Sequence, residues 1–537
     1  MKLFARFKAL FQKPENWCFG LILAVYLLTR LWAIDQFPIY FFSDEAIQPV
    51  LAADLASRAF FDAQAHFLPT FFQNVDKYSL GTTVYLHVLP TLLLGKSVIV
   101  ARGVSALVSL LAVLAVSLML KNVFQRRDWW LAGLLLSITP AWFLHSRTTF
   151  ETVSFVSFYA LFLYFYLRYR QGFSSQLYPA LVCGALAFYA YNPGQVVIVV
   201  TGLGLLLSDL RWHWEQRPTT LRGLGLLALL SLPFVRYLLT YPGENLQHLA
   251  TLNSYWTQTL PLAEKLRLYA LNYLSGLNPL YWYLPNTLDL ARHLMKGYGH
   301  ILIISAPLAL IGFVWMLRRL ASPSARILLI AWLAAPTGAA LVGPGVTRLL
   351  VMVIPLALFT ALGLSLSLET LENRFPHLRQ IPTTLSLALL LAFNLAMTVD
   401  ALRNGPTWFQ DYGLYGMQYG GQQVFSTVRE LQRTDPELIV IVSPRWANNV
   451  PVLGEFFLPN LYTTYFVPVD SYLSAYWPID PDSLFVLLPD ELQRAQASQK
   501  FKTVEIQQVL NYPNGQPGFY FVRLEYLENI QEILPQP

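Results

Sequence analysis

Long apolar runs separated by short polar stretches dominate the chain between residues 17 and 399. A membrane-spanning helix needs about 20 mostly apolar residues, and runs near this length recur along this part of the chain. They predict about eleven membrane-spanning helices. The predicted spans are 17–32, 98–120, 129–144, 152–167, 178–191, 195–207, 224–240, 299–316, 327–342, 346–368 and 383–399.

A shorter apolar run, residues 80–95, carries His87 and Pro90. If this run crossed the membrane, the basic loop 121–127 would fall on the external side. Basic loops are concentrated on the cytoplasmic side of membrane proteins. We therefore predict that residues 80–95 form an interfacial or re-entrant helix rather than a span.

The basic residues at the N-terminus orient the whole chain. Lys2, Arg6, Lys8 and Lys13 precede the first span, which predicts a cytoplasmic N-terminus. No small-residue cleavage site follows the first apolar run, so it reads as a retained span. With this orientation every internal loop carries at least two basic residues. Residues 35–79, which include a helix-like stretch at 46–61, and residues 241–298 then form long external segments.

The pattern changes after residue 400, where apolar spans give way to short β-rich runs. Alternating strand-like and helix-like stretches predict a small soluble α/β domain on the external face. The expected division is a transmembrane domain over 1–400 and an extracytoplasmic domain over 401–537. The strand-like runs are 438–442, 484–488 and 519–524, the helix-like runs are 422–432 and 490–500, and the connector is 411–421.

Composition agrees with a polytopic α-helical membrane protein that has external juxtamembrane helices. The chain is 55% hydrophobic and only 13% charged, whereas soluble domains carry about 25% charged residues. The net charge of +6 comes largely from loops between spans, so no nucleic-acid partner is expected. The two cysteines, Cys18 and Cys183, form no metal-ligand spacing, and no nucleotide-binding loop is present. No metal or cofactor is therefore predicted.

An acidic pair, Asp44-Glu45, follows the aromatic stretch Tyr40-Phe41-Phe42 in the first external segment. Asp44 could be an N-cap for a helix that begins at Glu45 or Ala46, because its side chain can accept hydrogen bonds from free amides there. The alternative is that the pair carries chemistry at the membrane surface. The residue types near Asp44 leave both interpretations open.

Several cationic residues lie at the external ends of predicted spans. Ionisable groups at such positions usually face a cavity or a partner. Each one alone could be a snorkelling or paired side chain, but together they predict a cationic pocket. Arginine binds phosphate through a planar fork that stays charged, so this pocket would suit a lipid-linked phosphate. The residues are Arg102, Arg147, Arg236, Arg292, His293, Lys296 and Arg348.

A further carboxylate, Glu151, is predicted on the same side of the membrane. It follows Arg147 by four residues, so it could form a salt bridge along a helix. It could equally belong to the site that contains Asp44. Carboxylates beside arginines provide a general base together with groups that stabilise a phosphate leaving group.

This ordered set of residues resembles the C-type membrane glycosyltransferases, known as GT-C. It is most similar to the branch that contains the dolichyl-phosphate-mannose protein mannosyltransferases and the bacterial lipid A aminoarabinose transferases. The resemblance covers about residues 15–365. Its second acidic position is often an aspartate in the family and is Glu151 here. The matching residues are Ser43-Asp44-Glu45, Ala101-Arg102, Ser137-Ile138-Thr139-Pro140, His145-Ser146-Arg147, Glu151, Arg292-His293, Gly297-Tyr298-Gly299, Pro336 and Arg348.

The resemblance implies an inverting transferase of the cell envelope, which moves a hexose or pentose from a polyprenyl-phosphate donor to an acceptor hydroxyl. The acceptor would be a protein, lipid or glycan at the external face of the plasma membrane. Asp44 would be the general base, and Glu45 and Glu151 would orient acceptor, sugar or arginines. The implied substrate-binding residues are Lys77, Arg102, Arg147, Arg292, His293, Tyr298 and Arg348.

Two other functions remain compatible with the sequence. The chain could be a catalytically inactive scaffold subunit of a membrane complex, with its C-terminal domain as a docking surface. It could also transport a lipid-linked substrate. Transporters usually show repeated halves with sites near the bilayer midplane. This sequence has no evident repeat, and its unusual charges collect at the external interface.

Overall fold

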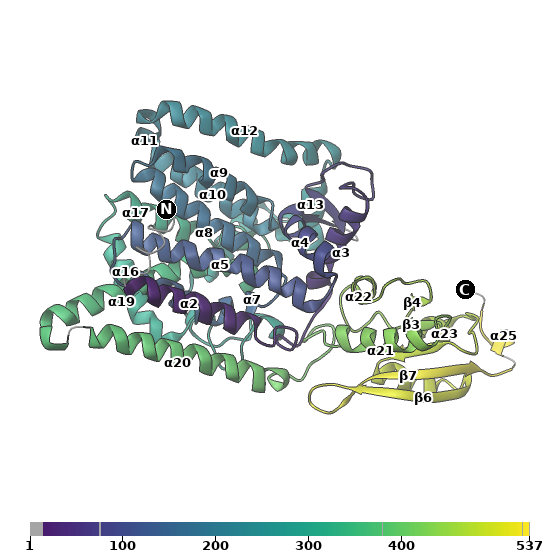
Figure 1. Cartoon of the computed structure of the whole chain (residues 1–537). Helices are drawn as coiled ribbons and strands as arrows, with labels where there is room; N and C mark the ends of the chain where they lie inside the picture. The colour runs from purple at the N-terminus through teal and green to yellow at the C-terminus, as the bar shows by residue number, and fades with distance from the viewer. Residues whose placement is uncertain (1–13, 75–76, 379, 529, 536–537) are drawn as a thin grey trace.

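The computed structural model describes residues 14–74, 77–378, 380–528 and 530–535. A helical part extends to Asn404, and a C-terminal part is built on a five-stranded sheet. The C-terminal part lies at one end of the helical part (Figure 1), and we call this end the domain end. The predicted fold class, a helical membrane protein with a C-terminal α/β unit, is confirmed.

A helix lies within every predicted span. By length and apolar composition, five helical segments of the described chain are candidates to cross a membrane: Val98–Asn122, Arg217–Thr240, Pro323–Leu341, Val346–Arg374 and Ile381–Thr407. The helices of the bundle are α2 (Pro14–Leu31), α5 (Val98–Asn122), α6 (Leu131–Ser137), α7 (Pro140–His145), α8 (Glu151–Arg170), α9 (Leu177–Phe188), α10 (Asn192–Ser208), α11 (Leu210–Glu215), α12 (Arg217–Thr240), α16 (Ala306–Leu317), α17 (Pro323–Ala334), α18 (Val346–Leu349), α19 (Val353–Arg374) and α20 (Ile381–Asn404).

The predicted spans at 129–144 and 299–316 are among those that differ from the observed helices. The span at 129–144 is divided into α6 and α7, because Pro140 lacks an amide hydrogen and begins a new helix. The span at 299–316 becomes α-helical only at Ala306, after a short 3-10 turn at Ile303–Ser305. Both breaks lie in apolar sequence, where hydrophobicity alone gives no sign of them.

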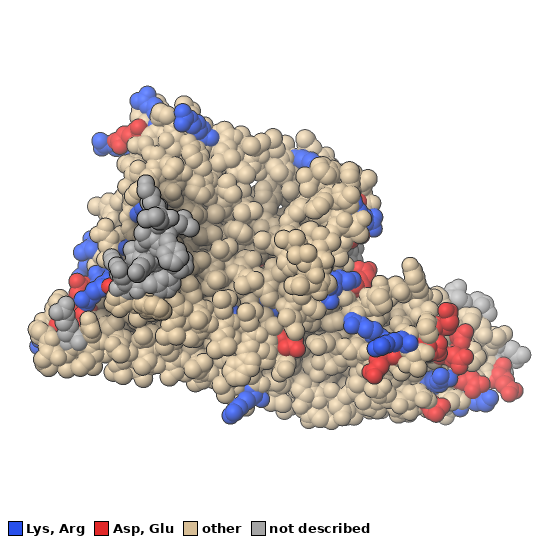
Figure 2. Space-filling model, in the orientation of Figure 1, with Lys and Arg blue, Asp and Glu red and all other residues tan. Residues whose placement is uncertain are grey.

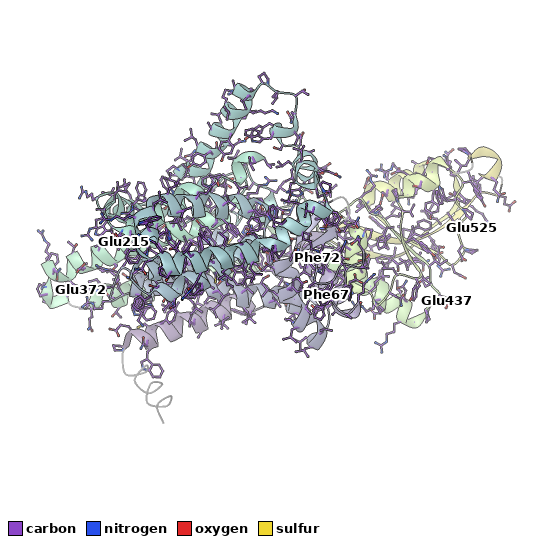
Figure 3. The ribbon with its side chains drawn as sticks, turned by 90° about the horizontal axis from the view of Figure 1, so that it is seen from above. Phe67, Phe72, Glu215, Glu372, Glu437 and Glu525 are labelled. Carbon is purple, nitrogen blue, oxygen red and sulfur yellow. The ribbon has the colours of Figure 1, made fainter. Side chains whose placement is uncertain are left out.

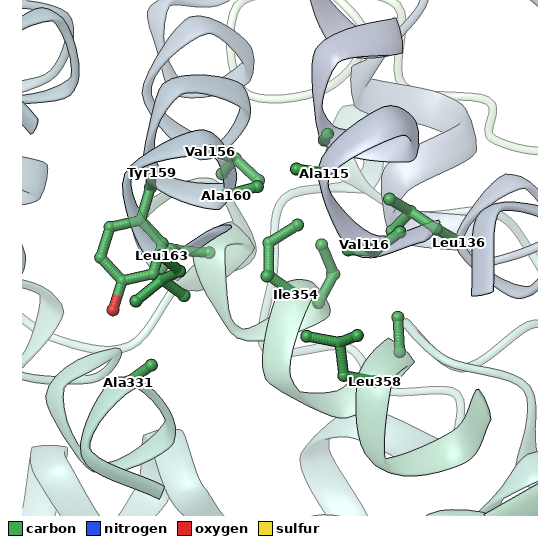
Figure 4. Close-up of a cluster of buried hydrophobic side chains, with 14 of the residues drawn as sticks. Ala115, Val116, Leu136, Val156, Tyr159, Ala160, Leu163, Ala331, Ile354 and Leu358 are labelled. Carbon is green, nitrogen blue, oxygen red and sulfur yellow. The ribbon is translucent and has the colours of Figure 1, made fainter. Parts of the chain in front are cut away.

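Small and branched side chains form the centre of the bundle. Val116, Val156 and Ile354, from α5, α8 and α19, are fully buried in one cluster (Figure 4). Helices α16 and α19 approach most closely at Gly312 and Gly363. A Cβ added to Gly363 would lie 1.9 Å from the Leu308 carbonyl oxygen. Glycine is therefore needed where these two backbones meet.

The segments predicted as external loops contain short helices and a hairpin. Helix α3 begins at Ser43, three residues before the predicted start, and packs on α4 through Ala52, Leu55, Val84 and Val88. Helix α4 has 14 residues, which agrees with a helix too short to span a membrane. These elements are α3 (Ser43–Ser57), β1 (Phe71–Asn74), β2 (Lys77–Leu80), α4 (Gly81–Leu94), α13 (Glu244–Thr251), α14 (Leu262–Leu277) and α15 (Pro279–Tyr283).

The C-terminal sheet has the strand order β4-β3-β5-β7-β6. Strand β3 pairs in parallel with β4 and with the central strand β5, and β7 pairs antiparallel with β5 and β6. The predicted strands are confirmed as β3, β5 and β7, whereas β4 and β6 were not predicted. The elements are α21 (Gly421–Thr434), β3 (Val440–Val442), α22 (Val450–Phe457), β4 (Thr464–Phe466), α23 (Val469–Ser474), β5 (Leu484–Leu487), α24 (Pro489–Ala497), β6 (Phe501–Asn511), β7 (Pro517–Tyr526) and α25 (Ile530–Ile533).

Aromatic packing joins the two parts just before α3. The ring of Phe41 lies 4.7 Å from that of Phe456 and 5.5 Å from that of Phe457, centroid to centroid. On the face seen in Figure 2, charged residues gather at the two ends and over the C-terminal part, with an uncharged band between them. This distribution is typical of a protein whose middle lies in a bilayer.

Candidate active site

The start of α3 presents one carboxylate to the outside. Tyr40, Phe41 and Phe42 are buried, and Asp44 is the one exposed residue between positions 40 and 49. Phe42 occupies the N-cap position without a side-chain cap, so the interpretation of Asp44 as the N-cap of this helix is wrong. Asp44 lies in the first turn instead, where a negative charge is favoured by the helix dipole. Within the described residues its carboxylate accepts no hydrogen bond, which leaves both oxygens available.

Glu45, the next residue, has the opposite environment. Its side chain is 0% exposed and lies between α3, α5 and the start of α8. One carboxylate oxygen is 2.7 Å from Nη2 of Arg102, and the other accepts from Arg102 Nε and from the Thr149 amide, each at 2.9 Å. With these partners the carboxylate is committed to the fold. The sequence predicted that Glu45 orients acceptor, sugar or arginines, and the structure pairs it with an arginine, Arg102.

Arg102 is equally committed to protein acceptors. Its Nη1 donates to the carbonyl oxygens of Ile34 and Pro38, each at 2.9 Å, and its Nη2 also donates to the Tyr40 carbonyl. Together with the bonds to Glu45, these acceptors use all the N–H groups of the guanidinium. The predicted contact between Arg102 and a donor phosphate is therefore replaced by a structural role.

Arg147 closes the C-terminal end of α2. Its guanidinium donates to the carbonyl oxygens of residues 29, 30, 32, 33 and 37 at 2.6 to 3.1 Å. The last carbonyls of a helix have no partner within the helix, and a cation there satisfies them and the helix dipole. With no N–H left for a ligand, Arg147 is also removed from the phosphate-binding set. For the same reason the predicted salt bridge from Arg147 to Glu151 is wrong.

Arg292 lies on the open side of the site, in the 3-10 turn Ala291–His293. Its Nη1 donates to the Gly416 carbonyl at 2.8 Å, while its Nε is buried without a partner among the described residues. Burial lowers the pKa of Arg292, and the nearby charge of Asp44 opposes that shift. Arg292 therefore combines a fixed position, an unused donor and a direct electrostatic interaction with Asp44.

His293 stacks on His145, with ring centroids 5.5 Å apart. Burial, together with the positive charges of Arg292 and Arg348, lowers the pKa of His293 well below its usual value. The imidazole is therefore neutral at physiological pH. It can accept or donate a hydrogen bond near the arginines, but it adds no positive charge to the site.

Arg348 follows the turn Gly343-Pro344-Gly345 and is half-buried. In the part of the chain that the structure describes, its one hydrogen bond runs from Nη1 to the Gly343 carbonyl at 3.5 Å. Gly343 has φ +144°, a value that favours glycine. Unlike Arg102 and Arg147, Arg348 keeps most of its donors for a ligand.

Asp289 holds this turn in place and was not identified from the sequence. Its Oδ1 accepts from the Val346 amide at 2.7 Å, and its Oδ2 accepts from the Tyr281 hydroxyl and from His300 Nε2, each at 2.9 Å. The side chain is 4% exposed. Burial alone would raise the pKa of Asp289, but these bonds bring it below its ordinary value. The carboxylate is therefore charged and supports the backbone that carries Arg348.

Glu151 and Tyr191 complete the open side. Glu151 lies in the first turn of α8 and accepts a 2.6 Å bond from Gln48 Nε2, on α3. The charges of Arg348, Glu151 and Asp44 all act on the phenol of Tyr191. Both carboxylates and Arg348 are thus within electrostatic range of one hydroxyl, although they come from three separate segments.

One predicted residue, Tyr298, does not join this group. The hydroxyl of Tyr298 donates to Asp400 Oδ2 at 2.9 Å, and its ring packs in a separate cluster with Phe37, Phe143 and Met397. Tyr298 thus ties the loop before α16 to α20. The backbone of Lys77 lies in β2, but its side chain is outside the described residues.

An apolar groove runs along several helices of the bundle. It has a volume of about 380 Å³ and is lined by α8, α9, α10 and α12, from Tyr166 and His213 at one end to Tyr189 and Phe234 at the domain end. The Tyr189 hydroxyl accepts from the Phe234 amide at 3.1 Å and donates to the Leu230 carbonyl at 2.8 Å. It thus lies between the amide of Phe234 and the carbonyl of Leu230, next to Pro233 within α12.

The open side therefore brings together a free carboxylate and two incompletely bonded arginines. A carboxylate can accept a proton, and the arginines can bind an anionic phosphate. The described residues include no group of three or more histidine, cysteine, aspartate or glutamate side chains placed to hold a metal ion. We call Asp44, Glu151, Arg292 and Arg348 the open cluster, and Glu45, Arg102 and Arg147 the buried layer.

Comparison with known proteins gives the same fold. A family model described as dolichyl-phosphate-mannose-protein mannosyltransferase matches residues 82–237, which include Glu151 but none of the other residues of the open cluster. No curated protein sequence matches the chain.

Among solved structures, the chain is similar to ArnT from Cupriavidus metallidurans in the apo state, with 12% identity and a TM-score of 0.58 over 96% of this chain and 99% of that one. The same protein bound to undecaprenyl phosphate gives 13% identity and a TM-score of 0.58, over 94% and 97% of the two chains. The archaeal oligosaccharyltransferase AglB from Archaeoglobus fulgidus, in complex with an inhibitory peptide and a dolichol-phosphate, gives 12% identity and a TM-score of 0.50, over 97% and 77%. The chain therefore has the C-type membrane glycosyltransferase fold, and the predicted resemblance is confirmed.

Proposed function

We propose that this membrane protein, with its C-type glycosyltransferase fold, is an inverting glycosyltransferase that uses a polyprenyl-phosphate sugar. The observation that carries the proposal is the placement of Asp44, which is exposed, free of hydrogen bonds within the described residues, and electrostatically coupled to Arg292. A transferase of this kind needs a base, a phosphate site and a path for a lipid tail. The open cluster supplies candidates for the first two, and the apolar groove supplies a candidate for the third.

The donor phosphate would bind between Arg348 and Arg292. Arg348 has most of its N–H groups unused, and the Nη2 of Arg292 makes no hydrogen bond among the described residues, so together they can contact several phosphate oxygens. Lys77 stays in the proposal as a further cation, because its strand leads directly into α4. The isoprenoid chain would follow the groove between α9, α10 and α12, whose lining is almost entirely apolar. One of the similar solved structures, that of ArnT, contains bound undecaprenyl phosphate, which supports a ligand of this class.

The reaction would be a single in-line displacement. Asp44 accepts the proton of the acceptor hydroxyl while the acceptor oxygen attacks the anomeric carbon. The bond between that carbon and the phosphate oxygen breaks on the opposite face, and the configuration inverts. The departing polyprenyl phosphate takes the bonding electron pair, and the two arginines stabilise its negative charge. Glu151 would orient sugar or acceptor, with its position fixed by Gln48 on α3.

The buried layer would support this reaction without touching substrate. Glu45 and Arg102 join α3 to α5, while Arg147 joins the end of α2 to the segment before α8. These contacts hold the N-terminal turn of α3 against the start of α8, where Asp44 and Glu151 are found. His293 is proposed as a neutral neighbour of the phosphate site, and Tyr298 as a structural residue outside it.

We further propose that the N-terminus lies in the cytoplasm and that residues 401–537 form an extracytoplasmic domain. The basic loops at the end remote from the C-terminal part support this orientation. The open cluster would then face the outside of a plasma membrane, where acceptor proteins, lipids or glycans are accessible.

The test is transfer from a defined donor. Purified protein in proteoliposomes would be mixed with polyprenyl-phosphate hexoses and pentoses that carry a radiolabelled sugar, together with envelope extract from a deletion strain as the acceptor source. We expect label to enter an acceptor, with release of unlabelled polyprenyl phosphate. No turnover with any donor, combined with loss of a membrane complex in the deletion strain, would favour the inactive-scaffold alternative. Movement of intact donor across the vesicle membrane without transfer would favour the transporter.

A further inference from the structure

The segment between α3 and β1 forms an ordered hairpin that exposes large apolar side chains. Phe61 and Phe67 pair through an isolated β-bridge, and their rings lie 5.2 Å apart. The exposed fractions are 37% for Phe60, 41% for Phe61, 54% for Phe67 and 47% for Leu68. We call residues 58–70 the aromatic hairpin. An apolar patch of this kind on a protein surface usually marks a contact with a partner or a membrane.

The hairpin is held in this shape by its own backbone. Phe60 and Leu68 both have positive φ, at +66° and +46°, a region that bulky residues rarely adopt. The Leu68 amide donates to the Phe60 carbonyl at 2.9 Å, and Asp62 accepts from the amides of Gln64 and His66 across the turn. Outward apolar side chains are thus built into an ordered, strained loop, which is the situation in which strain points to a function.

The aromatic hairpin lies against the end of helix α12, and the surroundings of α12 indicate what covers the hairpin. Arg236 Nη1, in the last two turns of α12, donates to the Phe67 carbonyl at 3.1 Å, and the Tyr241 ring lies 6.1 Å from that of His66. Figure 1 shows the chain after α3 beside the end of α12. Helix α12 is one of the membrane-span candidates, and only 11% of its most apolar stretch is buried inside the protein. Its exposed side chains, which include Leu239 at 79%, therefore face lipid.

We propose that the aromatic hairpin inserts Phe60, Phe61, Phe67 and Leu68 into the membrane leaflet at the domain end. The lipid-facing surface of α12 continues directly into these side chains, and aromatic residues favour the bilayer interface. Phe72, five residues after Phe67, is 3% exposed and packs in the protein instead. Figure 3 labels both residues where the helical part meets the C-terminal part.

This insertion has a consequence for the open cluster. The hairpin begins directly after α3 ends at Ser57, and Asp44 lies at the other end of that helix, about 20 Å away at the rise of an α-helix. One end of α3 is thereby fixed to the bilayer and the other to the buried layer. Insertion of the hairpin does not depend on the proposed enzymatic activity, because it concerns only whether lipid or water surrounds these side chains.

A depth measurement tests the proposal. Cys18 and Cys183 would be replaced by alanine, and a nitroxide label would be attached to Phe67→Cys in the full chain, reconstituted in phosphatidylcholine vesicles. Collision of the label with oxygen, which concentrates in lipid, would be compared with collision with a water-soluble nickel chelate. Leu239→Cys serves as the lipid-facing control, and Tyr462→Cys, at a residue that is 84% exposed in the C-terminal part, as the water-facing control.

We expect the ratio of oxygen to nickel collisions at position 67 to match that of position 239 and to exceed that of position 462 severalfold. A ratio like that of position 462 would overturn the proposal. Low access to both reagents would also overturn it, since a second copy or another protein would then cover the hairpin. If Phe67→Cys does not fold, Leu68→Cys decides the question by the same ratios.

Discussion

The open cluster and the buried layer contain the same residue types, and they differ in how many of their hydrogen bonds the protein already supplies. Arg102 and Arg147 donate every N–H group to protein oxygens. Arg348 has one long bond to a backbone carbonyl within the described residues, and Arg292 keeps a buried Nε unused. The carboxylates differ in the same way, because Glu45 is saturated and Asp44 is free.

This difference separates structure from chemistry better than charge or position does. A buried ion that is fully bonded has been compensated for its lost hydration, and removing its partner leaves an isolated charge in the interior. An ion whose N–H donors are not all used by the protein contributes less to the stability of the fold, and its free donors can bind a ligand. The two groups should therefore respond to mutation in opposite ways: the buried layer through stability, and the open cluster through activity.

The largest effect is expected for Asp44→Asn. The amide keeps the size of the side chain but does not accept a proton, so transfer should fall by roughly 10²–10⁴-fold, the usual contribution of a general base. The rate would be measured with the donor found active in proteoliposomes. Transfer at the parental rate would show that another residue is the general base. The open cluster would then no longer be the group that acts through activity.

The same variant is expected to remain folded. Asp44 accepts no hydrogen bond among the described residues and lies in the first turn of α3, so its replacement removes only a helix-dipole interaction. At an exposed helix start this is worth about 0.3–1 kcal/mol. The apparent melting temperature in detergent should stay within a few degrees of the parent. A large loss of stability would mean that Asp44 has a structural role.

Glu45→Gln should show the reverse pattern, with a large loss of stability. The substitution leaves Arg102 buried and uncompensated, which typically costs about 3–5 kcal/mol. Thermal unfolding in detergent, followed by aggregation of the unfolded protein, would measure the change. The double variant Glu45→Gln with Arg102→Met, which removes both charges, should recover part of the loss. If Glu45→Gln alone is as stable as the parent and inactive, Glu45 belongs to the open cluster.

Arg348→Ala should weaken donor binding at normal stability. A charge-assisted hydrogen bond contributes about 1.5–3 kcal/mol, so the donor KM should rise by roughly 10- to 100-fold. Arg236→Ala provides a matched control, because Arg236 is also at the domain end but bonds to the Phe67 carbonyl outside the open cluster. An equal rise in both variants would indicate general electrostatic attraction rather than a phosphate site.

The contrast between the two groups also marks the limit of the sequence. Apolar runs and loop charges predict the helices, the external segments and the strands β3, β5 and β7, because hydrophobic periodicity reports burial directly. They place Asp44, Arg292 and Arg348 on one side. They do not show that Arg102 and Arg147 are saturated, since the acceptors are backbone carbonyls of residues 29–40, brought near by tertiary packing.

Asp289 was missed for a related reason. It is one carboxylate within a long polar segment, and nothing in its neighbours distinguishes it from a solvated loop residue. Its importance arises only when the loop folds back and places it against Val346, Tyr281 and His300. Strand β6 was missed because its polar residues lack the alternation that marks a half-buried strand. It forms the edge of the sheet, where one partner is enough.

The smallest effect is expected from Asp289→Asn, which tests whether the buried layer and the open cluster are linked. Asp289 is nearly as buried as the members of the buried layer, and its carboxylate is as fully bonded, yet the backbone it holds carries Arg348 of the open cluster. The amide can still accept from Val346 but opposes the donors of Tyr281 and His300, at a cost of about 1–2 kcal/mol. The donor KM should therefore rise by roughly tenfold while kcat changes little. In an Arg348→Ala background the same substitution should leave the donor KM unchanged, because the residue it positions is gone. If the effects of the two substitutions on the donor KM are independent and additive, Asp289 supports the fold in general. The open cluster and the buried layer would then be separate groups with no link through Asp289.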